Sequence, residues 1–305
     1  MKFQYQVYGL PLFSEIELPS LVGIGDVELS NPIKVSLGKV PLALVSEPNE
    51  TKPFSTYNEN EFLFDLPNVA KYYVSNGNAI VIEPIGENWE EILLHLYANG
   101  ISAALYQRNL LPFHVSGVFV NENKVLLFAA PSRTGKSTTA LMLQQKGYAP
   151  FTDDTAILKV KNGKCYAQAS YPMARLWQQT IENQHQYAEE NKRVLFEETE
   201  KYGFSFHETF NPKMVEVLGF IFLEEAGLEI QIDKLTPTNS LEYFTNNIYR
   251  YQWVKGMKKQ RLQFEHISTI INAVPSYLAR RPKNRNTFES FAEAIETEIV
   301  KKIEN

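Results

Sequence analysis

The chain has 305 residues, of which 44% are hydrophobic and 21% are charged, and its formal net charge is −5. These values are ordinary for a globular protein, and the length allows one or two domains. The negative balance argues against a nucleic-acid partner, because such binding depends on clustered Lys and Arg. The one cysteine, Cys165, excludes an internal disulfide and argues against a cysteine-based zinc cluster.

The first residues, MKFQYQVYGLPLFSE, have no apolar run behind their single lysine, which argues against a secretory signal. No stretch of the sequence approaches the ~18 apolar residues of a membrane span. We therefore expect a cytoplasmic protein that has no membrane partner.

Short strands dominate the first part of the sequence. Residues 71–83 form two strand-like runs around Asn76-Gly77, and both turn residues tolerate a positive φ, so this segment predicts a β-hairpin. Alternating apolar residues and turn chemistry predict further strands. These lie within 2–9, 32–38 and 61–66.

A helix is predicted over 89–107. Asn88 is placed to cap its N-terminus, and Glu91, three residues later, is the capping-box partner. Apolar residues recur at helical spacing along this segment and give it a wide apolar face. We place a domain boundary behind the helix, so that residues 1–108 form a β-rich N-terminal domain and 109–305 form a second domain.

Helices and strands alternate in the second part of the chain. The polar stretch 180–208 is weakly periodic, and it fits either a solvated pair of helices or a mobile flap. Gly147 is a suitable residue to end the helix that precedes it, and Asn162-Gly163 predicts a second hairpin. The expected strands are 114–120, 124–129, 155–160, 164–169, 215–223 and 275–280, and the expected helices are 136–146, 240–255, 265–273 and 287–303.

A phosphate-binding loop lies between one of these strands and the following helix. The Walker A pattern is G-x-x-x-x-G-K-[ST], and residues 130–137 read APSRTGKS. The loop amides would hold phosphate oxygens, Lys136 would bridge the β- and γ-phosphates, and the Ser137 hydroxyl would be a Mg²⁺ ligand. Two residues depart from the usual pattern, because Ala130 replaces the first glycine and Arg133 stands where a glycine is common.

Two adjacent carboxylates, Asp153 and Asp154, follow the loop, its helix and a short strand. A helix of ten residues is ~15 Å long, and the chain then returns along the strand, so the pair can come back beside Ser137. Adjacent side chains at a strand end point in different directions. One carboxylate can therefore bind Mg²⁺ while the other faces an acceptor, although a polar turn before a hairpin is the alternative.

These segments resemble the HPr kinase family, and in particular its branch in peptide-modification gene clusters. The resemblance rests on the order of His114-Val115-Ser116, the loop APSRTGKST, the helix ending QQKGY and the Asp153-Asp154 pair. The segment SYPMARLW, residues 170–177, resembles a YPxxRLW segment of that branch. The opening YGLPLFSEIELPSL, the segment ISAALYQRNLLPFH and VPSYLARRP fit as well, so that most of the chain outside 181–212 is covered.

The resemblance implies an ATP-dependent serine kinase with a P-loop catalytic domain of the HPr kinase and PEP carboxykinase-like type over 109–305. The fold class would be α+β and α/β, with residues 1–108 as a substrate or accessory domain. Asp153 would bind Mg²⁺ and Asp154 would be the base that acts on the acceptor hydroxyl. His114 would lie near the γ-phosphate or the base. The acceptor would be a peptide or protein serine, such as that of a lasso-peptide precursor.

The nucleotide contacts expected for ATP and Mg²⁺ follow the loop. They are Ser132, Arg133, Thr134, Gly135, Lys136, Ser137 and Thr138, with Ser137 and Asp153 as metal ligands. Arg175 could contact phosphate or a peptide carboxylate, or form a surface ion pair. A basic cluster at 280–285 reads as a solvated loop, with a nucleotide or acidic-substrate contact as the alternative.

Two other functions remain open at this level. A small-molecule kinase would phosphorylate a metabolite hydroxyl, with 181–212 acting as a lid. A non-catalytic nucleotide-binding regulatory protein would bind ATP without transfer. The sequence leaves the oligomeric state and any reverse reaction open.

Overall fold

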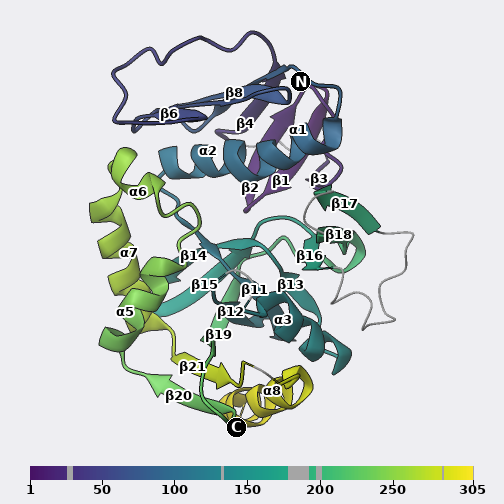
Figure 1. Cartoon of the computed structure of the whole chain (residues 1–305), viewed down its shortest axis with the longest axis vertical. Helices are drawn as coiled ribbons and strands as arrows, with labels where there is room; N and C mark the ends of the chain where they lie inside the picture. Colours follow the sequence, from purple (N-terminus) through teal and green to yellow (C-terminus); the bar gives the residue numbers. More distant parts are fainter. Residues whose placement is uncertain (26–29, 132–133, 178–191, 197–200, 284, 305) are drawn as a thin grey trace. The chain divides into compact units, whose positions relative to one another are not determined.

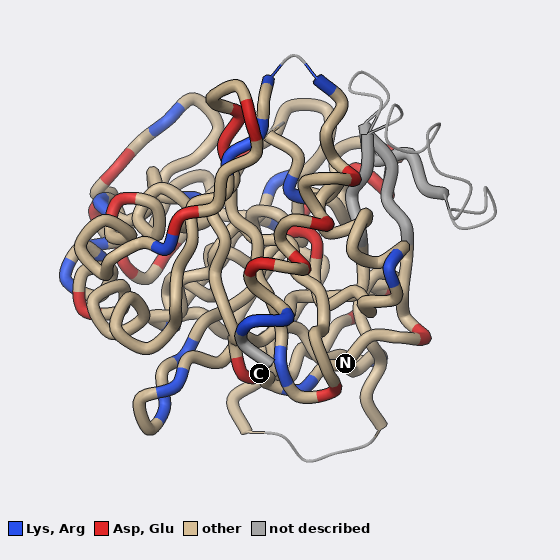
Figure 2. Tube along the Cα trace, turned by 90° about the horizontal axis from the view of Figure 1, so that it is seen from below, with Lys and Arg blue, Asp and Glu red and all other residues tan. Residues whose placement is uncertain are grey.

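The computed structural model of the chain describes residues 1–25, 30–131, 134–177, 192–196, 201–283 and 285–304 (Figure 1). The chain divides into two compact units, one of residues 1–112 and 250–264 and the other of residues 113–249 and 265–305. The sequence division differs from these units, because it assigned 250–264 to the second domain. Basic and acidic residues are interspersed along the described trace (Figure 2).

The first unit is built on a nine-stranded sheet with the order β3-β1-β2-β4-β9-β8-β7-β6-β5. Most neighbours are antiparallel, but β2 pairs with β4, and β4 with β9, in parallel. The strands are β1 (Phe3–Val7), β2 (Leu10–Ser14), β3 (Val22–Gly23), β4 (Ile33–Leu37), β5 (Glu50–Lys52), β6 (Ser55–Tyr57), β7 (Glu61–Leu66), β8 (Ala70–Ser75) and β9 (Ala79–Pro84). The β-rich character expected for this part of the chain is confirmed.

Local signals account for the hairpin and the helix of this unit. Asn76 and Gly77 have φ values of 53° and 66° and connect β8 to β9, which confirms the predicted hairpin. The expected helix is α1 (Trp89–His95), a π-helical turn η1 (Leu96–Gly100) and α2 (Ile101–Gln107). Asn88 caps it as predicted, because its side chain accepts a 3.2 Å hydrogen bond from the Glu91 N–H.

The segment 250–264 belongs to the first unit because of its aromatic packing. It contains the short helix α6 (Trp253–Gly256), and the Trp253 ring lies 4.7 Å from Phe62 and 6.2 Å from Tyr57, centroid to centroid. Burying such rings contributes ~1.5–3 kcal/mol each. This packing explains why residues 250–264 belong to the first unit, although the residues before and after them in the sequence belong to the second.

The second unit is built on a mixed sheet with the order β10-β14-β15-β19-β12-β11-β13, extended by β21 beside β19 and by β20 beside β21. Its strands are β10 (Pro112–His114), β11 (Ser116–Asn121), β12 (Lys124–Ala129), β13 (Pro150–Thr152), β14 (Thr155–Lys161), β15 (Lys164–Ala169), β19 (Val215–Glu225), β20 (Gln231–Leu235) and β21 (Ser276–Arg281). A separate sheet has the order β16-β18-β17, formed by β16 (Met173–Trp177), β17 (Lys192–Phe196) and β18 (Lys201–Ser205). The helices are α3 (Lys136–Gln145), α5 (Pro237–Asn246), α7 (Gln260–Ala273), α8 (Phe288–Ile295) and α9 (Lys301–Glu304), with a 3₁₀ turn η4 (His207–Thr209) and a π-helical turn η5 (Glu296–Val300). Of α7, residues 265–273 belong to this unit and the residues before them to the first.

Alternation along the strands separates the two faces of this sheet. Phe128 and Leu223 pack in one cluster with Leu143 of α3 and Phe291 of α8. Phe222 points to the other face, where its ring lies 5.1 Å from that of Phe244 on α5. Figure 1 shows α3 and α5 on opposite sides of β12 and β19.

Three expectations need correction. His114 ends β10 instead of opening a strand over 114–120, and the next strand begins at Ser116. The expected helix 240–255 is replaced by α5 and α6, which lie in different units. Helices are also wrong for 192–196 and 201–205, where KRVLF and KYGFS are strands, in keeping with their β-branched and aromatic residues. The rest of that polar stretch, 178–191 and 197–200, lies outside the described residues.

In the described part of the chain, no helix has both the length and the apolar character needed to cross a membrane.

Candidate phosphate-binding site

The predicted phosphate loop begins at the carboxyl end of β12, and α3 follows it. Gly135 precedes the helix with φ 100° and ψ 22°, a left-handed conformation that favours glycine. Lys136 is 7% exposed, and its Nζ donates a 2.9 Å hydrogen bond to the carbonyl of Ala130. The lysine thus folds back over the loop from which it comes.

Ala130, the departure from the Walker A pattern, is compatible with this loop. Its backbone is not among the positions of positive φ, so the conformation does not call for a glycine. The residue is 3% exposed and lies in the hydrophobic cluster with Ala140 and Leu143 of α3. The methyl group therefore contributes to the packing of α3.

Gly135 is closely covered by two side chains from the C-terminal part of the chain. A Cβ placed on Gly135 would lie 2.6 Å from Cε1 of Phe288 and 3.6 Å from an Nη atom of Arg281. The Arg281 guanidinium stacks on the Phe288 ring at 4.0 Å and bonds to the Glu225 carboxylate. Phe288 and Arg281 together form the wall of the loop at this point.

The expectation of a solvated basic loop is therefore wrong for Arg281, which is 5% exposed. Burial lowers the pKa of Arg281, and Glu225 opposes this shift. The guanidinium stays charged, because its ordinary pKa is far above neutrality. Arg280 is also engaged, since it bonds to Glu224 and Asp233.

The pairing of the strands brings Asp153 to the end of the sheet at which β12 runs into the loop. Ser116 lies opposite Phe128, near the end of β12, and Thr152 lies opposite Gly117 in the next strand. The Ser116 hydroxyl donates a 2.7 Å hydrogen bond to Oδ1 of Asp153. Ser116 shares its strand face with Val118, which packs with α3. Asp153 thus lies at the edge and on the face where α3 begins.

The backbone of Asp154 is hydrogen-bonded to the residue after His114, at the same end of the strands. Asp154 is 8% exposed, and its carbonyl accepts a hydrogen bond from the Val115 N–H at 3.2 Å. The His114 N–H donates to the Asn247 carbonyl at 2.8 Å, and its ring stands edge-on to Tyr249. These contacts place His114 between the aspartate segment and the end of α5.

Glu224 is a further carboxylate at this edge. β19 runs parallel to β12, with Phe222 opposite Ala129, so Glu224 lies just beyond the end of the loop strand. Its Oε1 accepts a 3.1 Å hydrogen bond from the Tyr243 hydroxyl, and its Oε2 lies 3.3 Å from Nε of Arg280. Burial, followed by the contact with Glu224, raises the pKa of Tyr243, so its hydroxyl remains a donor. The run FIFLE, four apolar residues before a carboxylate, is the sequence signal for this position.

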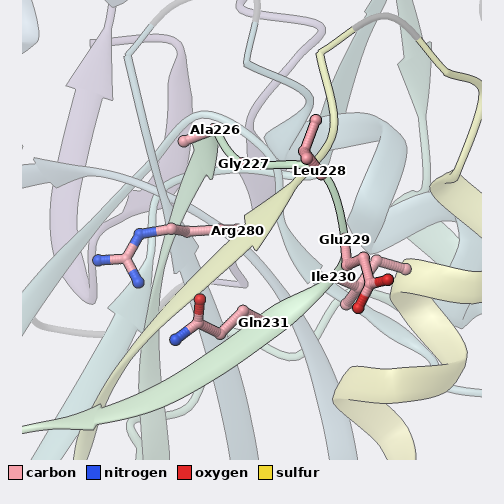
Figure 3. A pocket seen from close by; sticks show the side chains of 7 residues that line it. All are labelled: Ala226, Gly227, Leu228, Glu229, Ile230, Gln231 and Arg280. Carbon is pink, nitrogen blue, oxygen red and sulfur yellow. The ribbon is translucent and has the colours of Figure 1, made fainter.

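Two cavities border these strands. One, of about 260 Å³, is lined by Ala129, Ala130, Pro131, Phe222, Leu223, Glu224, Glu242, Tyr243, Asn246 and Asn247. The other, of about 520 Å³, is lined by the connection from Ala226 to Ile230, by Gln231 and by Arg280. Figure 3 shows Arg280 and Gln231 extending to one side of this second cavity and Glu229 to the other. The first cavity alone is lined by residues of the phosphate loop.

The residues present fit a nucleotide phosphate and Mg²⁺. α3 begins at Gly135 without a side-chain cap, so its first amides can donate to phosphate. Among the described residues, no three His, Cys, Asp or Glu side chains form a metal cluster. Mg²⁺ suits such a site, because it commonly takes one or two protein oxygens together with phosphate oxygens.

Several predicted contacts are not described. Ser132 and Arg133 lie outside the described residues. Arg175 lies in β16, opposite Gly203 of β18, with only its backbone described. Thr134, Ser137 and Thr138 flank Gly135 and Lys136 in the loop and the first turn of α3.

No protein-family model matches the chain, and no curated protein matches it. Among solved structures, the Hpr(Ser) kinase/phosphatase from Coxiella burnetii is 12% identical with a TM-score of 0.35, and the match covers 64% of this chain and 99% of that chain. A similarity of this size carries no argument about the site, whose chemistry has to follow from its own residues.

Proposed function

We propose that the chain is an ATP-dependent kinase that phosphorylates a serine hydroxyl of a peptide or protein. One observation carries the proposal. The loop with the Walker A-like motif follows β12, and Ser116, which lies opposite Phe128 near the end of β12, donates a hydrogen bond to the Asp153 carboxylate. The sequence resemblance to HPr kinases supports the choice of a serine acceptor, and within that family a ribosomal peptide precursor is the substrate that we favour.

The loop amides and Lys136 would bind the phosphates of ATP, with Thr134 and Thr138 beside them. Ser137 and Asp153 would hold Mg²⁺, which supplies positive charge against the phosphate oxygens when bound. The Ser116 hydroxyl orients the Asp153 carboxylate through its 2.7 Å hydrogen bond. Phe288 and Arg281 keep the loop in its left-handed turn at Gly135.

Asp154 would be the base for the transfer. The serine oxygen attacks the γ-phosphorus, and the bond from this phosphorus to the bridging oxygen of ADP breaks. The hydroxyl proton goes to the Asp154 carboxylate, and ADP leaves with the bond electrons. Most of the rate enhancement would come from positioning and from the positive charge around the transferred group.

The test is intact-mass analysis of serine peptides encoded beside this gene, after incubation with the protein, ATP and Mg²⁺. We expect a peptide to gain the mass of one phosphoryl group. Asp154→Asn should abolish this gain but still bind ATP, because its charge is not needed for the phosphates. Asp153→Asn should raise the Mg²⁺ concentration needed for transfer, because it removes a proposed ligand of the ion.

Other outcomes would contradict the proposal in distinguishable ways. Phosphorylation of free serine or another small alcohol, with all peptides unmodified, would indicate a small-molecule kinase. ATP binding without transfer to any acceptor would indicate a regulatory nucleotide-binding protein. Normal transfer by Asp154→Asn would remove this residue from the mechanism.

A further inference from the structure

The cavity of about 260 Å³ lies where the phosphate loop begins. β12 and β19 run parallel, and Ala129 lies opposite Phe222. The residues that follow on both strands line the cavity on the side of the sheet. They are Ala130, Pro131, Leu223 and Glu224. α5 closes it, because the Tyr243 ring lies 5.0 Å from the Phe222 ring. A group bound here would therefore lie next to the loop, on the sheet face opposite α3.

The size of the cavity suits a side chain better than a nucleotide. Pockets for drug-sized ligands commonly measure ~300–1,000 Å³, and this one is smaller. ATP, which is as large as such ligands, would not be enclosed. An amino-acid side chain with part of its backbone would be.

The lining is acidic and rich in hydrogen-bonding groups. Glu224 and Glu242 contribute carboxylates, Tyr243 a phenol, and Asn246 and Asn247 amides. Arg280 neutralises part of the Glu224 charge from outside the lining, while Glu242 is exposed at the rim. Of the lining residues that the structure describes, none is a Lys or an Arg.

We propose that this cavity receives the acceptor serine and that its carboxylates select a serine flanked by neutral or basic residues. The inference rests on the proposed kinase function and names its substrate class. An acidic flank would be held against Glu242 and Glu224, and like charges at such distances repel. A basic flank would be attracted, and Ala130 and Pro131 in the lining would bring the serine close to the transferred phosphoryl group.

The test compares three synthetic serine peptides that differ only in their flanks, which carry Lys, Asn or Glu. Phosphate transfer with ATP and Mg²⁺ is measured for the unaltered chain, for Glu242→Lys and for the control Glu293→Lys, together with ATP binding. Glu293 is exposed on α8, on the face opposite the cavity, so its variant makes the same charge change at another place.

We expect kcat/KM for the Lys- and Asn-flanked peptides to exceed that for the Glu-flanked peptide at least ~10-fold. Glu242→Lys should reduce this ratio ~3–10-fold, because a rim charge changes sign, and Glu293→Lys should leave it unchanged. A preference for the Glu-flanked peptide, or equal ratios in both variants, would overturn the inference while leaving the kinase function intact. ATP binding without transfer to any of the three peptides would overturn the cavity as a peptide acceptor site. Loss of ATP binding in all three proteins would overturn the proposed function itself.

Discussion

Buried or half-buried carboxylates occur in both units, but their surroundings differ. In the first unit, Glu61 is 6% exposed and both of its oxygens are occupied by donors of that unit. Oε1 accepts from the Val45 N–H and the Tyr73 hydroxyl, and Oε2 accepts from the Ser46 N–H and the Asn58 amide. Burial by itself would raise the pKa of Glu61, but these donors outweigh it and lower the pKa to about 2.

In the second unit, the carboxylates lie at the ends of strands near the predicted phosphate loop. Asp153 accepts a hydrogen bond from Ser116, and Glu224 is held by Tyr243 and Arg280 and lines a cavity. Burial of a charge thus does not by itself indicate chemistry. Glu61 ties a loop to its sheet, whereas Asp153 and Glu224 lie near the predicted phosphate loop, and Glu224 lines a cavity.

The largest effect is expected for Lys136→Ala. If the strand edge of the second unit is catalytic, loss of this charge removes a contact to the transferred phosphoryl group, and kcat should fall at least ~1,000-fold. Lys146→Ala is the matched control, because Lys146 follows the same helix and pairs with Glu296 instead. Steady-state kinetics with equal thermal unfolding midpoints would check the prediction, and near-normal activity of Lys136→Ala would refute it.

A smaller loss is expected for Gly135→Ala. An alanine at φ 100° is strained and its Cβ would collide with Phe288, so ATP affinity should fall ~100-fold or more. Gly147→Ala introduces the same strain at φ 98°, but its Cβ would meet no atom within 4 Å. The control should lose only ~1–2 kcal/mol of stability. Calorimetric ATP titration separates the two, and equal ATP affinities would show that the contact with Phe288 is unimportant.

Glu61→Gln tests the other side of the comparison. The pKa of Glu61 is lower in the folded state than in the unfolded state, so the carboxylate stabilises the fold above the unfolded-state pKa. This contribution, on the order of 2 kcal/mol, is lost as the pH falls from ~5 towards ~2. Glu61→Gln should therefore be less stable at pH 7, with a difference that shrinks in acid, and its transfer activity should be normal.

Urea unfolding followed at pH 7, 5 and 3 measures this difference. Stability curves that remain parallel through acid would show that the hydrogen bonds to Glu61 do not depress its pKa. A loss of kinase activity in the folded variant would show that the two carboxylate sets are not separate.

The smallest effect is expected for Tyr243→Phe. The variant keeps the ring against Phe222 but removes the hydroxyl that donates to Glu224. Such a hydrogen bond contributes ~1 kcal/mol, so kcat/KM for the acceptor should fall ~5-fold. The KM for ATP should not change, because the phenol lies on the face opposite α3. A selective rise in the KM for ATP would move the cavity from the acceptor to the nucleotide.

Local sequence signals predicted the parts of the fold that depend on near neighbours. Asn76-Gly77, Asn162-Gly163 and the Asn88 cap all act within a few residues, and the structure contains each of them. The strand before the loop and the helix after it followed from the motif. Whether Asp153 and Asp154 perform the chemistry assigned to them stays a prediction.

The remaining parts depend on pairing between distant segments. The run FIFLE indicates a carboxylate at a strand end, but only the parallel pairing of β19 with β12 places Glu224 beside the loop. Arg281 lies in a basic stretch that looks solvated until its contacts with Phe288 and Glu225 are known. The strands at 192–196 and 201–205 were not predicted, because the polar residues around them give the stretch only a weak hydrophobic pattern.

The contact between Gly135 and Phe288 also bears on the order in which the protein matures. The loop is synthesised long before the helix that begins at Phe288, and domains fold while the chain is still being made. A nascent chain that has reached β21 would have its phosphate loop but not the ring that covers Gly135. If this contact holds the loop in the shape that binds a phosphate, the proposed nucleotide site would be completed only when the second unit is nearly finished.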